Sequence, residues 1–157
     1  MQAKFQSSSP AATRALGRRL ARLLQPGDVV LLSGELGAGK TCFAQGIGQG
    51  LRVAEAVKSS SFVLVNEYHG RLKVYHADLF RLNDPGEVAD LALEETSADG
   101  VLVIEWPDRA WEEMPPERLL VRFDIVDDRR RDVTFDAAGR RYEALLAQLA
   151  QRAGAAL

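Results

Sequence analysis

The segment SGELGAGKTCF at residues 33–43 constrains the fold more than any other feature of the sequence. Within it, Gly34, Gly39, Lys40 and Thr41 follow the spacing G-x-x-x-x-G-K-T. Glycines at such positions let backbone N–H groups converge on a phosphate at the start of a helix, while the lysine and threonine suit the β- and γ-phosphates and Mg²⁺. An apolar strand, VVLL, precedes the loop and a helical pattern follows it. We therefore expect an α/β domain that binds a nucleotide.

The remaining hydrophobic pattern predicts a mixed sheet flanked by helices. Ser9 followed by Pro10 predicts a helix start. We expect helices over 10–24, 40–51, 85–93 and 142–149, a β-hairpin over 62–78 with a two-residue turn at His69-Gly70, and strands over 29–32, 101–105, 118–125 and 132–135. Only 29–32 and 101–105 have the continuous apolar sequence of buried parallel strands, whereas 118–125 and 132–135 alternate like antiparallel ones. The expected fold is a single P-loop NTPase-like domain over 1–157 with a mixed parallel/antiparallel sheet.

Composition narrows the function classes. With 157 residues, 46% hydrophobic and 27% charged, the chain is large enough for one globular domain with a core. No apolar run approaches the roughly 20 residues of a membrane span, and the first ten residues lack the apolar core of a signal peptide. The single cysteine excludes an internal disulfide, so we expect a cytoplasmic protein without a membrane anchor. A net charge of −2 argues against a nucleic-acid binder that relies on phosphate neutralisation alone.

Two carboxylates are candidates for the magnesium chemistry of the loop. A phosphate loop needs a second acid, at the end of another strand, to hold Mg²⁺ or its waters. The apolar run VLVIE ends at Glu105, and the less apolar VYHAD ends at Asp78. The alternative for each is a carboxylate that ends a strand at the surface.

Four further residues have ordinary structural interpretations. Trp106 either covers the nucleotide or fills the core, and the sequence leaves both open. For Trp111 we favour packing, and for His76 a packed or solvated position over a catalytic role. Cys42 stands at a helix start, where a thiolate is favoured, but no partner histidine is evident, so packing is favoured here as well.

Four motifs together resemble one family. GELGAGKT, SSSFVLVNEY, VYHADLFRL and VLVIEWP occur in the order and spacing of the bacterial TsaE (YjeE) family, from about Ser9 to Ala138. The resemblance implies a small P-loop ATPase of tRNA threonylcarbamoyladenosine synthesis, for tRNAs reading A-starting codons. Such proteins are not the transferase. ATP binding drives their association with TsaB and TsaD, hydrolysis allows repeated turnover, and tRNA is engaged indirectly.

The resemblance also implies roles for individual residues. Glu105 and Thr41 would bind Mg²⁺, and Lys40, Asp78 and Glu105 would form the catalytic set. Arg130, or its neighbour Arg129, matches an arginine on the nucleotide side. The full set implied to bind ATP is Ser9, Leu36, Gly37, Ala38, Gly39, Lys40, Thr41, Cys42, Ser61, Trp106, Asp108 and Arg130.

The sequence departs from the family pattern at two places. Ser59-Ser60-Ser61-Phe62 replaces the usual S-P-T-[FY], and Cys42 replaces a second threonine. Ser61 retains the hydroxyl group of the missing threonine. Loss of the proline gives that loop more conformations, at an ordering cost of about 0.5–1 kcal/mol.

Two other function classes compete with an assembly ATPase. Small-molecule kinases of the adenylate or shikimate type need repeated βα units and an arginine-bearing lid, and the hairpin expected over 62–78 leaves no room for a crossover helix. A non-catalytic adaptor would use ATP only as a switch. Hydrolysis measured with and without partners separates the adaptor from the ATPase.

Overall fold

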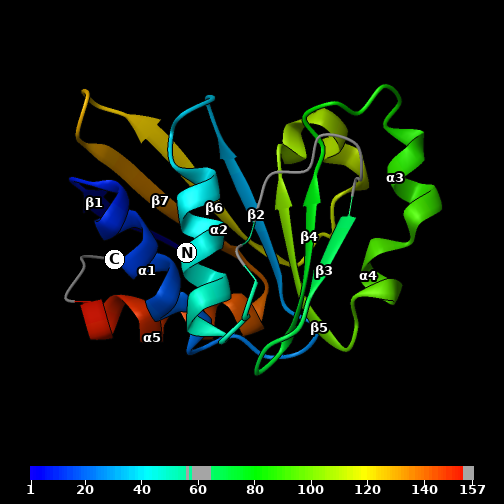
Figure 1. Ribbon diagram of the computed structural model, residues 1–157, viewed down its shortest axis with the longest axis horizontal. Helices are drawn as coiled ribbons and strands as arrows, with labels where there is room; N and C mark the ends of the chain where they lie inside the picture. The colour runs from blue at the N-terminus through cyan, green and yellow to red at the C-terminus, as the bar shows by residue number, and fades with distance from the viewer. Residues whose placement is uncertain (56, 58–64, 154–157) are drawn as a thin grey trace.

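The computed structural model describes residues 1–55, 57 and 65–153. The strands form one seven-stranded sheet in the order β1-β7-β6-β2-β5-β4-β3 (Figure 1). Their bounds are β1 (Gln2–Ser7), β2 (Val29–Gly34), β3 (Val65–Tyr68), β4 (Lys73–Asp78), β5 (Gly100–Glu105), β6 (Arg118–Ile125) and β7 (Arg131–Ala138). The helices are α1 (Pro10–Ala21), α2 (Lys40–Gly50), α3 (Gly86–Leu91), α4 (Leu93–Thr96), the 3₁₀ helix η1 (Pro107–Glu113) and α5 (Arg140–Ala153). The expected mixed α/β fold is confirmed.

The centre of the sheet is parallel and both edges are antiparallel. β4, β5, β2 and β6 are parallel neighbours, while β3 pairs with β4, and β7 with both β6 and β1, in antiparallel fashion. The sequence indicated only β2 and β5 as parallel strands. β4 and β6 were missed because each has one parallel and one antiparallel neighbour, and β6 also alternates between buried and exposed residues.

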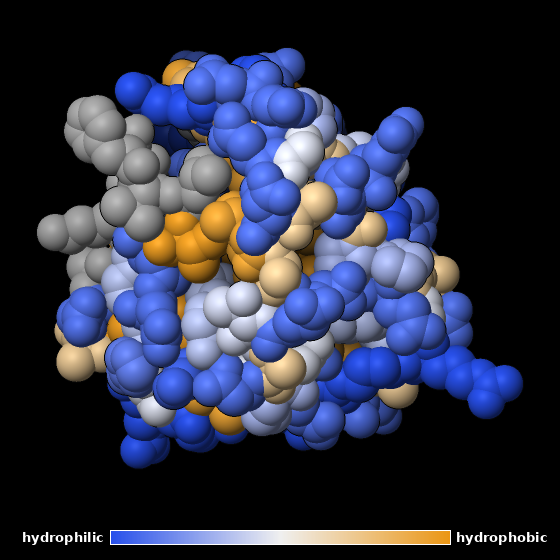
Figure 2. Space-filling view, turned by 90° about the vertical axis from the view of Figure 1, so that its right-hand side faces the viewer, coloured by the Kyte–Doolittle hydropathy of each residue, from blue (hydrophilic) through white to orange (hydrophobic). Residues whose placement is uncertain are grey.

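Apolar side chains form one core on each face of the sheet. The first core contains Leu20 of α1, Phe43 of α2 and Leu145 of α5, packed on Val30 and Val103. The second core lies under α3, α4 and η1 on the opposite face. Viewed from the side of α3 and α4, the surface is mostly hydrophilic with a confined apolar area (Figure 2). Within 1–55, 57 and 65–153, no helix combines the length and apolar character that crossing a bilayer requires.

Local chemistry explains where α1 starts and how closely it packs on α2. The Ser9 side chain accepts a hydrogen bond of 3.0 Å from the Ala12 N–H, and Pro10 occupies the first turn, as the sequence predicted. α1 and α2 lie side by side (Figure 1), and a Cβ added at Gly46 would overlap with the Arg14 carbonyl. The two helices therefore pack backbone against backbone.

The hairpin and the helix after it differ from the sequence prediction. β3 and β4 form the hairpin, but four residues, 69–72, connect them instead of two. The connection is held against the end of α2, because the Arg71 N–H donates to the Leu51 carbonyl at 2.5 Å. The part of the predicted hairpin at 62–64 lies outside the described residues.

The helix expected over 85–93 is two short helices, separated at Ala92, which has φ 46°. In one continuous helix Val88 and Leu93 would point about 140° apart. The left-handed turn instead brings both side chains into the second core. β1 and η1 were not predicted. β1 is short and alternates between exposed and buried residues, and its partner β7 lies at the far end of the chain.

Candidate functional site

The phosphate loop connects the end of β2 at Gly34 to the start of α2 at Lys40. Gly37 and Gly39 have φ values of 80° and 113°, which side chains rarely adopt. A Cβ built at Gly37 would meet no atom within 4 Å, so the loop faces open space there. The loop therefore has the shape of an anion cradle at a helix start.

Lys40 is enclosed by the loop. Its ammonium group is hydrogen-bonded to the carbonyl of Gly34 and, at 3.1 Å, to that of Glu35, and the residue is 5% exposed. Burial lowers the pKa of Lys40 below its ordinary 10.5, while the negative charges of Glu105, Asp108 and Asp78 oppose this shift. The Lys40 ammonium group is thus bound to two carbonyl groups of the loop and is stabilised in its charged form by three nearby carboxylates.

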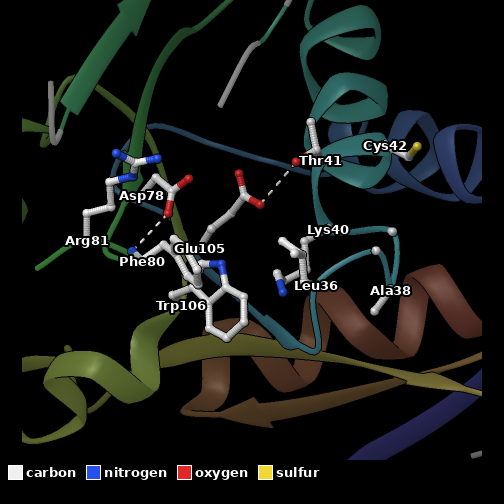
Figure 3. Close-up of a pocket in the computed structure, with 12 residues that line it drawn as sticks. Leu36, Ala38, Lys40, Thr41, Cys42, Asp78, Phe80, Arg81, Glu105 and Trp106 are labelled. Carbon is white, nitrogen blue, oxygen red and sulfur yellow. Dashed lines mark hydrogen bonds between the residues drawn. The ribbon is translucent and has the colours of Figure 1, made fainter. Parts of the chain in front are cut away.

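Glu105 and Asp78 end neighbouring parallel strands and lie opposite each other in the register of β4 and β5. The Thr41 hydroxyl donates to Glu105 Oε1 at 3.4 Å (Figure 3), and His76 Nε2 lies 2.6 Å from Glu105 Oε2. Glu105 is 2% exposed. Its carboxylate therefore connects the phosphate loop to the neighbouring strand.

Asp78 is more accessible than Glu105. Its Oδ1 accepts a hydrogen bond of 3.0 Å from the Phe80 N–H (Figure 3). Burial raises the pKa of Asp78 above its ordinary 3.8, the Phe80 hydrogen bond opposes this, and the charge of Glu105 adds to the increase. The two acids thus have different surroundings: Glu105 is enclosed and doubly hydrogen-bonded, whereas Asp78 faces the cavity.

A cavity of about 340 Å³ lies between the loop and these acids. Residues 36–42 line one side, and Asp78, Phe80 and Arg81 the other, with Glu105 and Trp106 between them (Figure 3). The structure therefore brings together all the predicted loop residues, both predicted acids and Trp106.

The Trp106 ring covers Lys40 and is only partly buried against the second core. The Lys40 ammonium lies 3.7 Å from the ring centroid, and the Phe80 ring packs against Trp106 with a centroid separation of 4.9 Å. Trp106 has φ 60°, a conformation that costs about 1–3 kcal/mol for a residue other than glycine. The strained turn directs the ring back across the mouth of the phosphate loop.

A second cavity of about 440 Å³ adjoins the outer side of the phosphate loop. Its lining includes Ser9, Cys42 and Arg129, but not Arg130. Arg130 Nε instead binds Asp127 Oδ2 at 2.7 Å, and hydrogen bonds from the N–H groups of Arg130 and Arg129 lower the pKa of Asp127 to about 2. Of the two arginines left open by the sequence, Arg129 is the one beside the cavity.

The remaining predicted residues are Asp108, Ser61 and Cys42. Asp108 is exposed and lines neither cavity, although its charge acts on Lys40. Ser61 lies outside the described residues. Cys42 lines both cavities, and its sulfur lies 3.8 Å from Arg14 Nη1.

The predicted packing of Trp111 is wrong: the residue is 42% exposed, and the centroid of its ring lies 4.6 Å from the Arg118 guanidinium carbon.

Sequence reasoning considered His76 without connecting it to Glu105, and it missed Phe80 and Arg81. The signal for His76 was its spacing from Asp78, because residues two apart on a strand share a face. Phe80 and Arg81 follow β4 closely and line the cavity.

Within the described parts of the chain, no three His, Cys, Asp or Glu side chains are grouped as a metal site. A bound Mg²⁺ would then take other ligands from phosphate and water, as is usual for this ion.

Comparison with known proteins identifies the family. The family model for threonylcarbamoyl adenosine biosynthesis protein TsaE matches residues 7–133. This chain belongs to the TsaE family. The tRNA threonylcarbamoyladenosine biosynthesis protein TsaE of Bacillus subtilis (strain 168) is 39% identical over 152 residues, covering 96% of this chain and 95% of the relative. The TsaE protein of Streptomyces coelicolor is 44% identical over 138 residues, covering 82% and 93%.

A solved structure agrees with this result. The crystal structure of Bacillus subtilis YdiB superposes with a TM-score of 0.82 at 35% identity, covering 98% of this chain and 97% of that one. The region matched to TsaE includes the phosphate loop, both acids and Trp106. The resemblance seen in the sequence is confirmed, and with it a role in tRNA threonylcarbamoyladenosine biosynthesis at the level of the family.

Proposed function

We propose that this TsaE protein binds ATP with Mg²⁺ and hydrolyses it to ADP and phosphate, as the ATPase of tRNA threonylcarbamoyladenosine synthesis. The observation that carries the proposal is the 3.4 Å contact between the Thr41 hydroxyl and Glu105 Oε1, directly beside Lys40. A phosphate loop threonine and a strand-end acid are the two protein groups expected to hold Mg²⁺ in such sites.

The residues present fit such a ligand. The loop is open at Gly37, where an added Cβ would meet no atom within 4 Å, and Lys40 supplies the cation suited to the β- and γ-phosphates. Thr41 and Glu105 would hold Mg²⁺, which supplies charge neutralisation at the phosphates when bound. Trp106 would cover the loop, and the second cavity beside Ser9 and Arg129 offers room for the rest of the nucleotide.

Asp78 is the residue suited to orient the attacking water. It lines the cavity opposite the loop, next to Glu105 in register. Its carboxylate can accept a proton or a hydrogen bond from water, whereas Glu105 is already engaged by Thr41 and His76. We therefore assign Glu105 to metal binding and Asp78 to water.

The antiparallel β3–β4 hairpin favours this proposal over a small-molecule kinase. In such kinases a strand-helix-strand crossover would occupy this part of the sheet, and here β3 and β4 are joined by a short connection. The acceptor for the phosphoryl group would accordingly be water.

The partners proposed are TsaB and TsaD, in the cytoplasm, with tRNA engaged through them. ATP binding would drive association with the TsaB–TsaD pair, and hydrolysis would allow repeated rounds of modification. TsaD, not this chain, would be the transferase. Because the proposed role makes turnover depend on TsaB and TsaD, we expect hydrolysis by the isolated chain to be slow.

Phosphate release by the purified chain, measured alone and with TsaB and TsaD, tests the proposal. We expect slow release alone and a substantial increase with both partners, together with ATP-dependent co-purification. Brisk turnover that ignores the partners would contradict the assembly role. Phosphorylation of a small molecule in place of phosphate release would support a kinase.

A further inference from the structure

His76 forms a buried connection to the site that the proposed chemistry leaves without a role. The residue lies on β4, two positions before Asp78, and is 2% exposed. Its Nε2 atom lies 2.6 Å from Glu105 Oε2, while the other oxygen of Glu105 faces the Thr41 hydroxyl at 3.4 Å. The Glu105 carboxylate is thus held on one side by a ring and directed on the other toward the phosphate loop.

The direction of this hydrogen bond follows from the chemistry of its two groups. A carboxylate oxygen can only accept, so Nε2 of His76 is the donor. The other ring nitrogen, Nδ1, is buried and has no hydrogen-bond partner among the described residues. Among the described residues, the only hydrogen bond of the His76 side chain is therefore the one to Glu105.

Neither ring nitrogen is placed to take part in the reaction itself. Nε2 is occupied by Glu105, Nδ1 is shielded from solvent, and His76 is absent from the lining of the cavity. Stability is also a poor explanation, because a buried polar pair is often no better than well-packed apolar side chains of similar volume. A buried nitrogen without a partner is a further cost. The pair is better explained by what it does to Glu105.

We propose that His76 is a positioning residue: it holds the Glu105 carboxylate toward Thr41 and thereby sets the Mg²⁺ dependence of nucleotide binding. The inference rests on the proposed function, which assigns Thr41 and Glu105 to Mg²⁺. Groups that hydrogen-bond to a metal ligand fix its orientation, and their loss typically lowers metal affinity or activity by about 10- to 100-fold. His76 acts through Glu105 and touches neither nucleotide nor metal.

Three substitutions separate the hydrogen bond from the volume of the ring. His76→Leu removes the donor, and His76→Gln places an amide N–H where Nε2 lies. His76→Asn is also an amide, but its shorter side chain reaches only the position of Nδ1. His69→Leu serves as the matched control, because His69 is exposed in the turn and pairs only weakly with Glu67 at 3.4 Å.

The measurement is the binding of a fluorescent ATP analogue, first in EDTA and then over a Mg²⁺ titration, with thermal unfolding recorded for every variant. We expect His76→Leu and His76→Asn to need about 10- to 100-fold more Mg²⁺ for half-maximal enhancement of binding. Affinity in EDTA should stay unchanged. His76→Gln should stay within about threefold of the unsubstituted chain, and His69→Leu should match it.

Three results would overturn the proposal. One is an unchanged Mg²⁺ midpoint in His76→Asn, which still decides the matter if His76→Leu does not fold. Another is an equal loss of affinity with and without Mg²⁺, which indicates a purely structural role. The third is seen before any variant is compared: if the unsubstituted chain shows no Mg²⁺-dependent binding, the proposed function itself fails and this inference with it.

Discussion

The ammonium group of Lys40 lies 3.7 Å from the centroid of the Trp106 ring. The same group is hydrogen-bonded to the carbonyls of Gly34 and Glu35, so the lysine is held between the loop and the indole. A cation over an indole ring contributes about 0.5–2 kcal/mol, depending on how far it is desolvated. This contact therefore couples the phosphate loop to the turn after β5.

This coupling predicts that Trp106 reports on nucleotide binding. If Lys40 leaves the loop carbonyls for phosphate oxygens, the surroundings of the indole must change. In a Trp111→Phe background, Trp106 is the only tryptophan. We expect its fluorescence to change on addition of ATP and Mg²⁺, and the same titration of Lys40→Ala to give a flat response. A Trp106 signal that is insensitive to saturating nucleotide would show that the ring does not cover the site.

Lys40→Ala should abolish ATP-dependent function while leaving the fold intact. The variant loses charge-assisted hydrogen bonds to phosphate, each worth about 1.5–3 kcal/mol, so nucleotide affinity should fall by about 10- to 100-fold or more. Circular dichroism should match that of the unsubstituted chain, and the free energy of unfolding should change by no more than about 2 kcal/mol, the upper value of the lost contact with Trp106. Full tRNA modification by the purified variant would contradict the assignment of the phosphate loop.

Glu105→Gln and Asp78→Asn should separate binding from hydrolysis. Glu105→Gln should weaken Mg²⁺-dependent nucleotide binding, because an amide is a poorer metal ligand than the carboxylate beside Thr41. Asp78→Asn should largely keep binding and lower hydrolysis by about 100-fold or more, since it cannot take up a proton from water. Titration of a fluorescent ATP analogue, alongside phosphate release, tests both. Equal losses of binding in the two variants would contradict this division of roles.

The pKa of Asp78 predicts how stability depends on pH. Burial raises this pKa above 3.8, so the folded protein retains the proton at pH values where the unfolded chain has released it. Ionisation of Asp78 therefore lowers the free energy of unfolding as the pH rises from 3.8 through the folded-state pKa. Asp78→Asn, which cannot ionise and can keep the hydrogen bond from Phe80, should raise the Tm at pH 7.

The same comparison at low pH supplies the control. Below pH 3.8 the carboxyl group is protonated in both states, and the Tm difference between Asp78→Asn and the unsubstituted chain should disappear. A Tm difference that persists unchanged from pH 7 to the acid limit would mean that packing, and not ionisation, distinguishes the two side chains.

Gly46→Ala should destabilise the protein although alanine favours helices. The added methyl group would overlap with the Arg14 carbonyl where α1 and α2 pack. Helix propensity gains up to about 1 kcal/mol, but overpacking against a rigid backbone costs up to about 3 kcal/mol, and we expect a net loss of about 1–2 kcal/mol in the free energy of unfolding. Gln148→Ala, at an exposed position of α5, should change it by less than about 0.5 kcal/mol. Chemical denaturation measures both, and a neutral Gly46→Ala would show that the helices can separate freely.

The features that could be predicted from the sequence depend on interactions within a few residues. The glycine loop between an apolar strand and a helix is one, because positive φ angles and a helix start are local properties. The Ser9 cap is another, since it needs only the N–H of Ala12. The positions of Asp78 and Glu105 at strand ends also followed from short stretches of sequence. These features sufficed for the family, the fold class and most of the candidate site.

The tertiary structure decided how these pieces meet. Packing of the two cores sets the register of β4 on β5, and that register places Asp78 opposite Glu105 and brings His76 within hydrogen-bond distance of the same carboxylate. Likewise, the contact between Lys40 and Trp106 depends on β2 and β5 being neighbours. Hydrogen bonds and ring contacts vary steeply with distance, and these distances are fixed by packing between segments far apart in the chain. No local preference of the sequence encodes them.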